Sequence, residues 1–229
     1  MSIAEKLTTI AENEQKVYDA GQKSEYDRFW ESYQENGNRT NYNGAFYGKG
    51  WSNETFKPKY DIKPTSANLS SIFRETSITG DLKTILDNLG IVLDTSGATS
   101  FSYSFYNNSF EKLPPIDMSG CGNTAYVFAL NPNLKELEIK VSEKTTYSGT
   151  FDRCPALEKL TVMGTIGQNG FNVSSSTKLT KDSLMGIMSA VKDYKNSTTT
   201  YTITLGNDNL AKLTDEEKAI ATQKGWTLA

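Results

Sequence analysis

Hydrophobic and polar positions follow their most regular pattern in the middle of the chain, between residues 100 and 162. Phenylalanines recur there every 23 residues, at Phe105, Phe128 and Phe151. Two further apolar positions keep nearly the same period, namely Phe110, Leu134 and Leu157, and Leu113, Leu137 and Leu160. A repeating unit cannot bury its apolar edge alone, so equivalent positions must stack on the neighbouring units. The pattern therefore predicts a stack of units of about 23 residues.

The end of each unit alternates apolar and polar residues. Leu137 and Ile139 in one unit, and Leu160 and Val162 in the next, are separated by single polar residues. Such alternation is typical of a short strand with one buried face. We expect a ladder of strands running from residues 91–93 through 113, 137–139 and 160–162 to 201–205, with the phenylalanines on the opposite wall.

Helical patterns flank the repeats. Residues 81–89 predict a short helix that ends at Gly90, and a second helix is predicted to begin after Thr180. Thr214 and Glu217 form a capping-box pattern before a third helix. We interpret the region after Val162 as a helix-containing C-terminal cap over the last apolar edge, with a docking surface as the alternative.

The first 35 residues also show helical spacing. Ile3, Leu7, Ile10 and Val17 alternate four and three like a heptad seam, which marks them as a candidate self-association or attachment helix. Packing of this stripe on its own domain is the alternative.

An aromatic segment rich in Gly and Asn follows, from about residue 36 to residue 60. Tyr42, Phe46, Tyr47 and Trp51 are candidate partner- or ligand-binding aromatics, because aromatic rings stack on sugar faces or on a protein with little loss of entropy. The alternative is that these rings pack inward and anchor irregular backbone. We place a domain boundary near Pro64, with a helical and aromatic-rich attachment region at 1–64 and the repeats with their cap at 65–229.

The amino-acid composition excludes several kinds of catalytic and metal-binding site. The 229 residues include no histidine, which excludes Ser-His-Asp and Cys-His catalysis and histidine-bound metals. The two cysteines, Cys121 and Cys154, are expected to be free thiols, with a bridge as the alternative. We therefore predict no catalytic residues, no cofactor and no metal, and a protein that is not an enzyme.

Charge and hydropathy argue against two classes of partner. The formal net charge of −3 and the lack of a concentrated basic patch predict no nucleic-acid binding. No apolar run approaches the ~20 residues that span a bilayer, so no membrane association is expected. The N-terminal stretch is acidic and amphipathic, which predicts that there is no secretion signal.

The third unit resembles the BspA-type leucine-rich repeats, whose unit is close to Phe-x-x-Cys-x-x-Leu-x-x-Leu-x-Val. Phe151, Cys154, Leu157, Leu160 and Val162 match every position, whereas Asn131 replaces the cysteine in the second unit and Asn108 does so in the first. The resemblance implies an α+β fold: a short irregular leucine-rich-repeat solenoid with a helical N-terminal segment and the C-terminal cap. It also implies that Cys154 is a small turn-filling residue and not a nucleophile.

Segments outside the repeats resemble leucine-rich-repeat proteins encoded by bacteriophages and prophages of Gram-positive gut bacteria. They are residues 4–13 with Val17 and Tyr18, and residues 26–30, 56–60 and 210–228. The resemblance implies a non-enzymatic structural or host-recognition (adhesion) protein of the virion or tail, assembled in the host cytoplasm. Its partner would be a virion component or host surface protein, or a cell-surface glycan, with a homo-oligomer formed through the N-terminal helix. The alternative is an intracellular interaction module that acts on a host protein.

Overall fold

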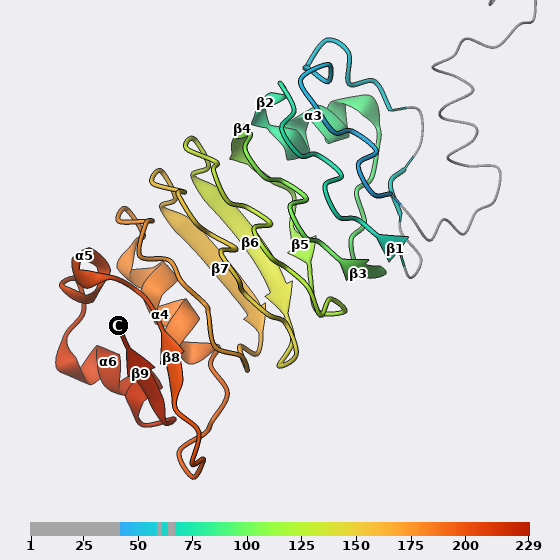
Figure 1. Ribbon diagram of the computed structural model, residues 1–229. Coiled ribbons are helices and arrows are strands. Elements are labelled where there is room, and N and C mark those ends of the chain that lie inside the picture. The colour runs from blue at the N-terminus through green and yellow to red at the C-terminus, as the bar shows by residue number, and fades with distance from the viewer. Residues whose placement is uncertain (1–41, 59–60, 64–66) are drawn as a thin grey trace, which may run out of the picture. The chain divides into compact units, whose positions relative to one another are not determined.

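The computed structural model describes residues 42–58, 61–63 and 67–229 (Figure 1). The described residues belong to one compact unit, and the boundary near Pro64 stays a prediction. The candidate attachment helix with Ile3, Leu7, Ile10 and Val17 lies outside the described residues.

The unit is built from short strands and a few helices. The strands are β1 (Ala67–Asn68), β2 (Thr79–Asp81), β3 (Ala98–Ser100), β4 (Ser109–Lys112), β5 (Ile116–Asp117), β6 (Glu136–Val141), β7 (Lys159–Gly164), β8 (Tyr201–Ile203) and β9 (Trp226–Leu228). The helices are α3 (Leu82–Leu89), α4 (Lys181–Ser189), α5 (Asn207–Leu210) and α6 (Asp215–Thr222). The main sheet has the order β2-β4-β6-β5, with β7 also paired to β6, and β1-β3 and β8-β9 form separate pairs.

The fold class predicted from the sequence, an α+β leucine-rich-repeat solenoid, is wrong. The paired strands are parallel, and the helices come between them along the chain, which gives a curled, mostly parallel sheet of α/β-like type. Parallel neighbours need a crossover connection, so the chain must return to the same end before each new strand. We call one such circuit a winding; the main windings end in β4, β6 and β7.

The 23-residue period appears directly in the register of the sheet. Leu137 pairs with Leu160 and Ile139 with Val162, so equivalent residues lie side by side in β6 and β7. On the facing wall the ring of Phe128 stacks between those of Phe105 and Phe151, at 5.9 Å from each. All three phenylalanines are fully buried. The apolar core therefore runs continuously from one winding to the next.

Capping residues mark the ends of the helices. The Asp81 side chain accepts a hydrogen bond from the Thr84 amide at the start of α3, and Gly90 closes that helix in the left-handed conformation. Thr180 caps α4 in the same way, and α6 has the complete capping box of Thr214 and Glu217. The strand predicted at 91–93 does not form: Leu93 makes an isolated bridge with Ile62, and Val92 is half exposed.

Buried polar side chains connect successive windings. The Asn108 amide donates to the Phe73 carbonyl at 2.8 Å, and the Asn131 amide donates to the Phe105 carbonyl at 2.7 Å. The Cys154 thiol donates to the Phe128 carbonyl at 3.0 Å. Asparagine and cysteine thus make the same kind of link at equivalent positions, because each carries a donor on a short side chain.

Candidate functional site

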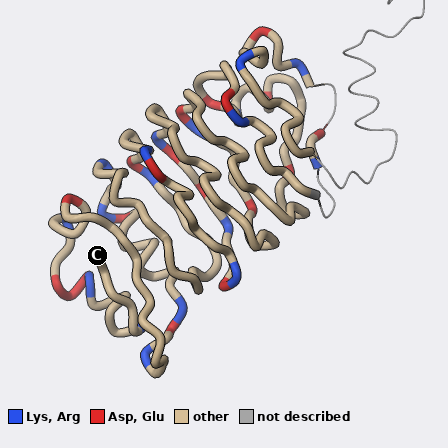
Figure 2. Tube along the Cα trace, viewed as in Figure 1, with Lys and Arg blue, Asp and Glu red and all other residues tan. Residues whose placement is uncertain are grey.

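The solvent-facing side of the parallel sheet carries the densest group of charged side chains in the main windings. Leu137 and Ile139 point into the core, so Glu136, Glu138 and Lys140 point to solvent from β6. Figure 2 shows basic and acidic residues alternating where β4, β6 and β7 begin. The parallel register lines these charges up in rows across the strands.

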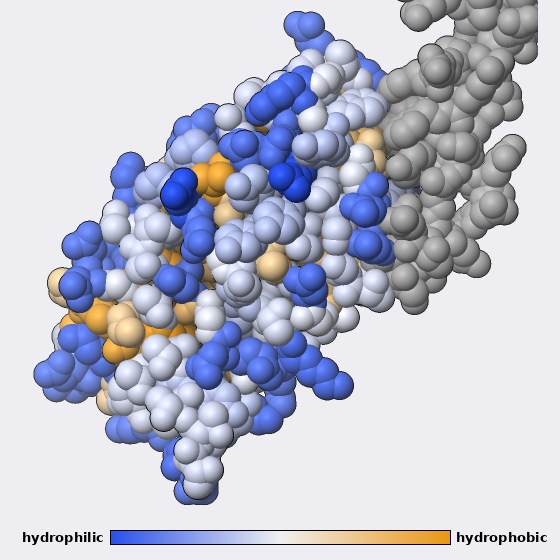
Figure 3. Space-filling view, in the orientation of Figure 1, coloured by the Kyte–Doolittle hydropathy of each residue, from blue (hydrophilic) through white to orange (hydrophobic). Residues whose placement is uncertain are grey.

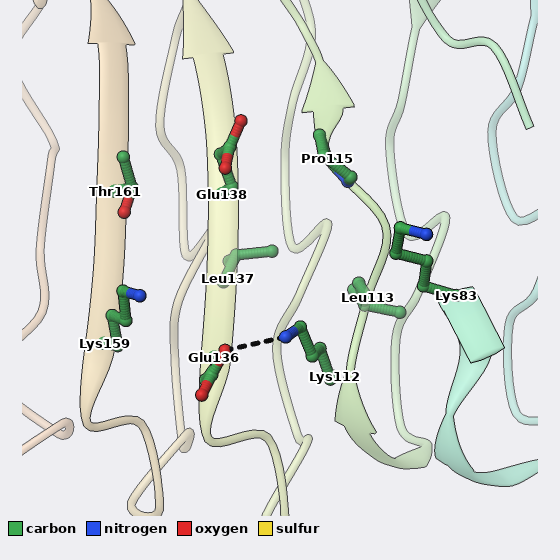
Figure 4. Close-up of a pocket in the computed structure, with 9 residues that line it drawn as sticks. All are labelled: Lys83, Lys112, Leu113, Pro115, Glu136, Leu137, Glu138, Lys159 and Thr161. Carbon is green, nitrogen blue, oxygen red and sulfur yellow. Dashed lines mark ion pairs between the residues drawn. The ribbon is translucent and has the colours of Figure 1, made fainter.

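The first row contains Lys112, Glu136 and Lys159, which are neighbours in register on β4, β6 and β7. The Lys112 ammonium lies 2.9 Å from the Glu136 carboxylate (Figure 4). The hydrogen bond from Lys112 lowers the pKa of Glu136, and the same contact raises the pKa of Lys112. Glu136 is therefore held ionised by its neighbour, while Lys159 makes no ion pair within the described part of the chain.

A further row pairs Asp117 of β5 with Lys140 of β6, whose charged atoms are 2.9 Å apart. Burial raises the pKa of Asp117, but hydrogen bonds from Ser119 and Lys140 outweigh it and leave that pKa below its ordinary value. This row extends the charged surface toward the ends of the strands.

A shallow trough of about 240 Å³ runs over the first row (Figure 4). Its lining residues are Lys83, Lys112, Leu113, Pro115, Glu136, Leu137, Glu138, Lys159 and Thr161. Lys83 reaches it from α3 and is paired with Asp87 on the same helix. Neighbouring hollows of about 340 Å³ against α4 and about 220 Å³ beside Asp117 continue the surface on either side.

The side chains of the trough that make no hydrogen bond or ion pair determine what it can bind. In residues 42–58, 61–63 and 67–229 neither Lys159 nor Glu138 makes a side-chain hydrogen bond or ion pair, and the Thr161 hydroxyl is also unused. The trough thus offers one ammonium, one carboxylate and one hydroxyl beside the exposed ring of Pro115, above the buried Leu113 and Leu137. Across the same described residues no group of three or more metal-ligating side chains was found, and no helix long and apolar enough to cross a membrane.

The thiols of the two cysteines lie away from this surface. Cys121 and Cys154 are free and buried, and burial raises the pKa of each thiol to about 12. A thiol with such a pKa stays protonated at neutral pH and is a poor nucleophile. The implied role of Cys154 as a small internal residue agrees with its position.

The aromatic residues singled out in the sequence fall into two environments. Phe46 is 1% exposed and stacks on Phe73 with ring centroids 5.0 Å apart, and Tyr42 is also buried. The half-buried Trp51 contacts the Phe46 ring edge-on. Phe46 and Tyr42 therefore belong to the core, whereas Tyr47 is 52% exposed and faces solvent.

Sequence reasoning missed a second polar and aromatic surface that includes Tyr47. The Arg74 guanidinium lies over the rings of Tyr47, Tyr103 and Tyr106, at 5.5, 5.1 and 5.4 Å. Tyr103 in turn stacks on Tyr126 at 5.2 Å. The signal was the spacing of 23 residues between Tyr103 and Tyr126, the same period as the phenylalanines.

Large apolar residues are rarely exposed on the described surface. Tyr47, Val92 and Met163 are the exposed examples, and they lie on different segments. The face seen in Figure 3 is mostly hydrophilic, with hydrophobic colour confined to a few areas. The described surface therefore offers a partner placed polar groups and rings more than a broad apolar patch.

In comparisons with family models, curated proteins and solved structures, no match to the chain was found.

Proposed function

We propose that this chain is a non-enzymatic recognition protein that binds another protein on the charged face of its parallel sheet. The observation that supports the proposal is the trough over the row Lys112, Glu136 and Lys159, in which one cation and one anion are left without a partner among the described residues. The resemblance of the terminal segments to phage-encoded proteins gives the setting: a virion- or tail-associated component that contacts another virion protein or a host surface protein.

Mixed charge favours a protein partner over other charged polymers. A segment with an acidic and a basic side chain can pair with Lys159 and Glu138 while an apolar side chain contacts Pro115. Such complementarity sets the register of a partner and raises its association rate more than its affinity. Glu136 and Glu138 would repel a phosphate backbone, so a nucleic acid fits this surface poorly.

The rigidity of the surface also favours binding. The trough lies on paired parallel strands, so the backbone positions of its charged residues are set by the sheet and not by mobile loops. A partner then has to order only the Lys159 and Glu138 side chains and not the backbone that carries them.

A photo-crosslinking residue at Thr161, in the trough, tests the proposal. The full chain is incubated separately with phage particles, intact host cells and soluble host lysate, and is then irradiated. We expect one defined crosslinked band with particles or cells. Lys159→Glu should weaken it at least tenfold, on the order of 1.4 kcal/mol, whereas Lys144→Glu, which makes the same charge change at an exposed residue outside the trough, should leave it unchanged.

Either of two results would overturn the proposal. Failure to crosslink to any protein would reject the trough as a binding surface, and so would an equal loss with Lys144→Glu. A band found with lysate alone would keep the trough as a protein-binding surface but reject the virion setting.

A further inference from the structure

A small cleft lies between three successive windings, on the segments that precede β4, β6 and β7. Its volume is about 220 Å³, and it is lined by Tyr106, Tyr126, Ala129, Leu130, Asp152 and Arg153. It shares no residue with the trough on the sheet. Two aromatic rings and two opposite charges therefore meet at a site that the trough does not explain.

The aromatic side of the cleft is fixed in place by other residues. Tyr103 stacks face to face on Tyr126 at 5.2 Å and contacts Tyr106 edge-on at 5.3 Å. Arg74 covers Tyr103 and Tyr106, and its guanidinium is in turn paired with Glu75 at 3.2 Å. The two rings that line the cleft thus belong to a preorganised stack, which spares a ligand the ordering of flexible side chains.

The backbone beneath Tyr126 is adapted to its ring. A Cβ atom at Gly149 would lie 2.4 Å from Cε1 of Tyr126, so only glycine lets the ring lie flat on the next winding. Tyr126 itself has a φ of 55°, in the left-handed region that Gly149 occupies at 61°. A bulky residue in this conformation is costly, on the order of 1 kcal/mol. The equivalent Tyr103 has nearly the same φ of 58°, so this conformation belongs to the turn of each winding.

The polar side of the cleft is formed by neighbouring residues of opposite charge. Within the described part of the chain the carboxylate of Asp152 and the guanidinium of Arg153 make no side-chain hydrogen bond or ion pair. Together they can accept and donate several hydrogen bonds to adjacent hydroxyl groups. Asp152 and Arg153 give the cleft no net charge and several hydrogen-bonding atoms, which suits an uncharged ligand with adjacent hydroxyl groups.

We propose that this cleft binds one neutral pyranose ring of a glycan. A pyranose has an apolar C–H face that can stack on the Tyr106 ring, because Tyr103 and Gly149 cover the two faces of Tyr126. The hydroxyls at its edge can reach Asp152 and Arg153. The volume is below the ~300–1,000 Å³ typical of sites for drug-sized ligands, which suits a single ring. This site is independent of the protein-binding trough, and either could exist without the other.

Saturation-transfer NMR on the full chain tests the proposal, with the methyl glycosides of glucose, galactose and N-acetylglucosamine as probes. We expect transfer to the ring C–H protons of at least one glycoside. Asp152→Asn and Arg153→Gln should each weaken binding at least fivefold, and Tyr106→Leu should abolish it while Tyr106→Phe retains it. Asp208→Asn, in the exposed start of α5, is the matched control and should have no effect.

Several outcomes would overturn the inference. They are absence of transfer from every glycoside, equal binding by the Arg153→Gln variant and the unchanged chain, and binding of inorganic phosphate in the same cleft. Circular dichroism of each variant checks its folding. Because Arg153 is exposed, the Arg153→Gln variant keeps the test valid if Tyr106→Leu fails to fold.

Discussion

The side-chain amide of Asn131 donates a hydrogen bond of 2.7 Å to the carbonyl oxygen of Phe105, which belongs to the previous winding. The same amide also reaches the Phe128 carbonyl at 2.8 Å. Its own carbonyl oxygen, Oδ1, is buried without a partner in the described structure. Asn131 therefore joins two windings through its donor atoms alone.

Replacing Asn131 tests this role. Asn131→Ala should lower the free energy of unfolding by about 1–3 kcal/mol, because two buried carbonyls lose their donor. Asn131→Cys should lower it less, since the thiol of Cys154 makes the equivalent bond to Phe128 and a cysteine would bring no unpaired oxygen. Urea denaturation of the two variants measures the difference, and equal losses would show that the donor is unimportant.

Two glycines that are both changed to alanine should respond in opposite directions. Gly164 has a φ of 88°, and a Cβ atom there would lie 2.0 Å from the Val141 carbonyl oxygen, so Gly164→Ala should destabilise the protein by about 2–4 kcal/mol. Gly186 is exposed within α4 and has open space around it, so Gly186→Ala should stabilise by up to ~1 kcal/mol. Thermal unfolding compares them, and a similar shift in both would contradict the close approach of Gly164 in β7 to Val141 in β6.

The Tyr147 hydroxyl offers a test of an unpaired polar group. Tyr147 is 1% exposed, its ring contacts Phe171 edge-on at 5.0 Å, and its hydroxyl has no hydrogen-bond partner in the described structure. Burial also raises the pKa of this hydroxyl. Tyr147→Phe should leave stability unchanged or raise it by up to ~1 kcal/mol, since the ring contacts remain. Tyr194→Phe, which removes a hydroxyl bonded to the Gly167 carbonyl at 3.0 Å, is the control and should lower stability.

Stability in acid should depend on Asp117. Its pKa is lower in the folded protein than in the unfolded chain, so its contribution is present above about pH 4 and is lost as the pH falls through the lowered folded-state pKa. Asp117→Asn should lower the free energy of unfolding by about 1 kcal/mol at pH 7. This difference between the variant and the unchanged protein should decrease toward pH 3. Urea titrations at pH 7, 5 and 3 measure it.

An exposed ion pair provides the control for Asp117. Glu111→Gln makes the same charge change at the pair with Lys135, in which both side chains are about half exposed. Exposed pairs contribute little, so this variant should change stability by a few tenths of a kcal/mol at any of the three pH values. A loss at pH 7 as large as that of Asp117→Asn would mean that the loss reflects total charge and not the hydrogen bonds of Asp117 to Ser119 and Lys140.

The features that the sequence predicted correctly are those set by particular residues at a fixed spacing along the chain. Phe105, Phe128 and Phe151 stack because identical rings at one period fit one another, and Thr214 with Glu217 caps α6 through purely local bonds. The fold class was wrong because the repeat indicates which residues stack, but not that helices such as α3 and α4 come between the strands along the chain. The strand predicted at 91–93 was also wrong, since Leu93 makes only an isolated bridge and Val92 is half exposed.

The candidate surfaces were harder to predict than the core. The trough needs Lys112, Glu136 and Lys159 in register, and charged residues that alternate on a strand look like any solvated face until the pairing is known. The stack of Arg74 on Tyr103 joins residues on different windings. Phe46 was a candidate binding aromatic with inward packing as the alternative, and its neighbours Phe56 and Phe73 bury it.

The constant offset between β6 and β7 restricts how the length of this protein can change. Each residue of β6 pairs with the residue 23 positions later, from Glu136 with Lys159 to Val141 with Gly164. An insertion or deletion of one residue inside a strand would turn every following side chain to the other face. Removal or duplication of a whole winding would keep inward residues inward and the charged rows aligned. The sheet can therefore gain or lose a whole winding without disturbing the pairing of its strands. It cannot gain or lose a single residue within a strand in the same way.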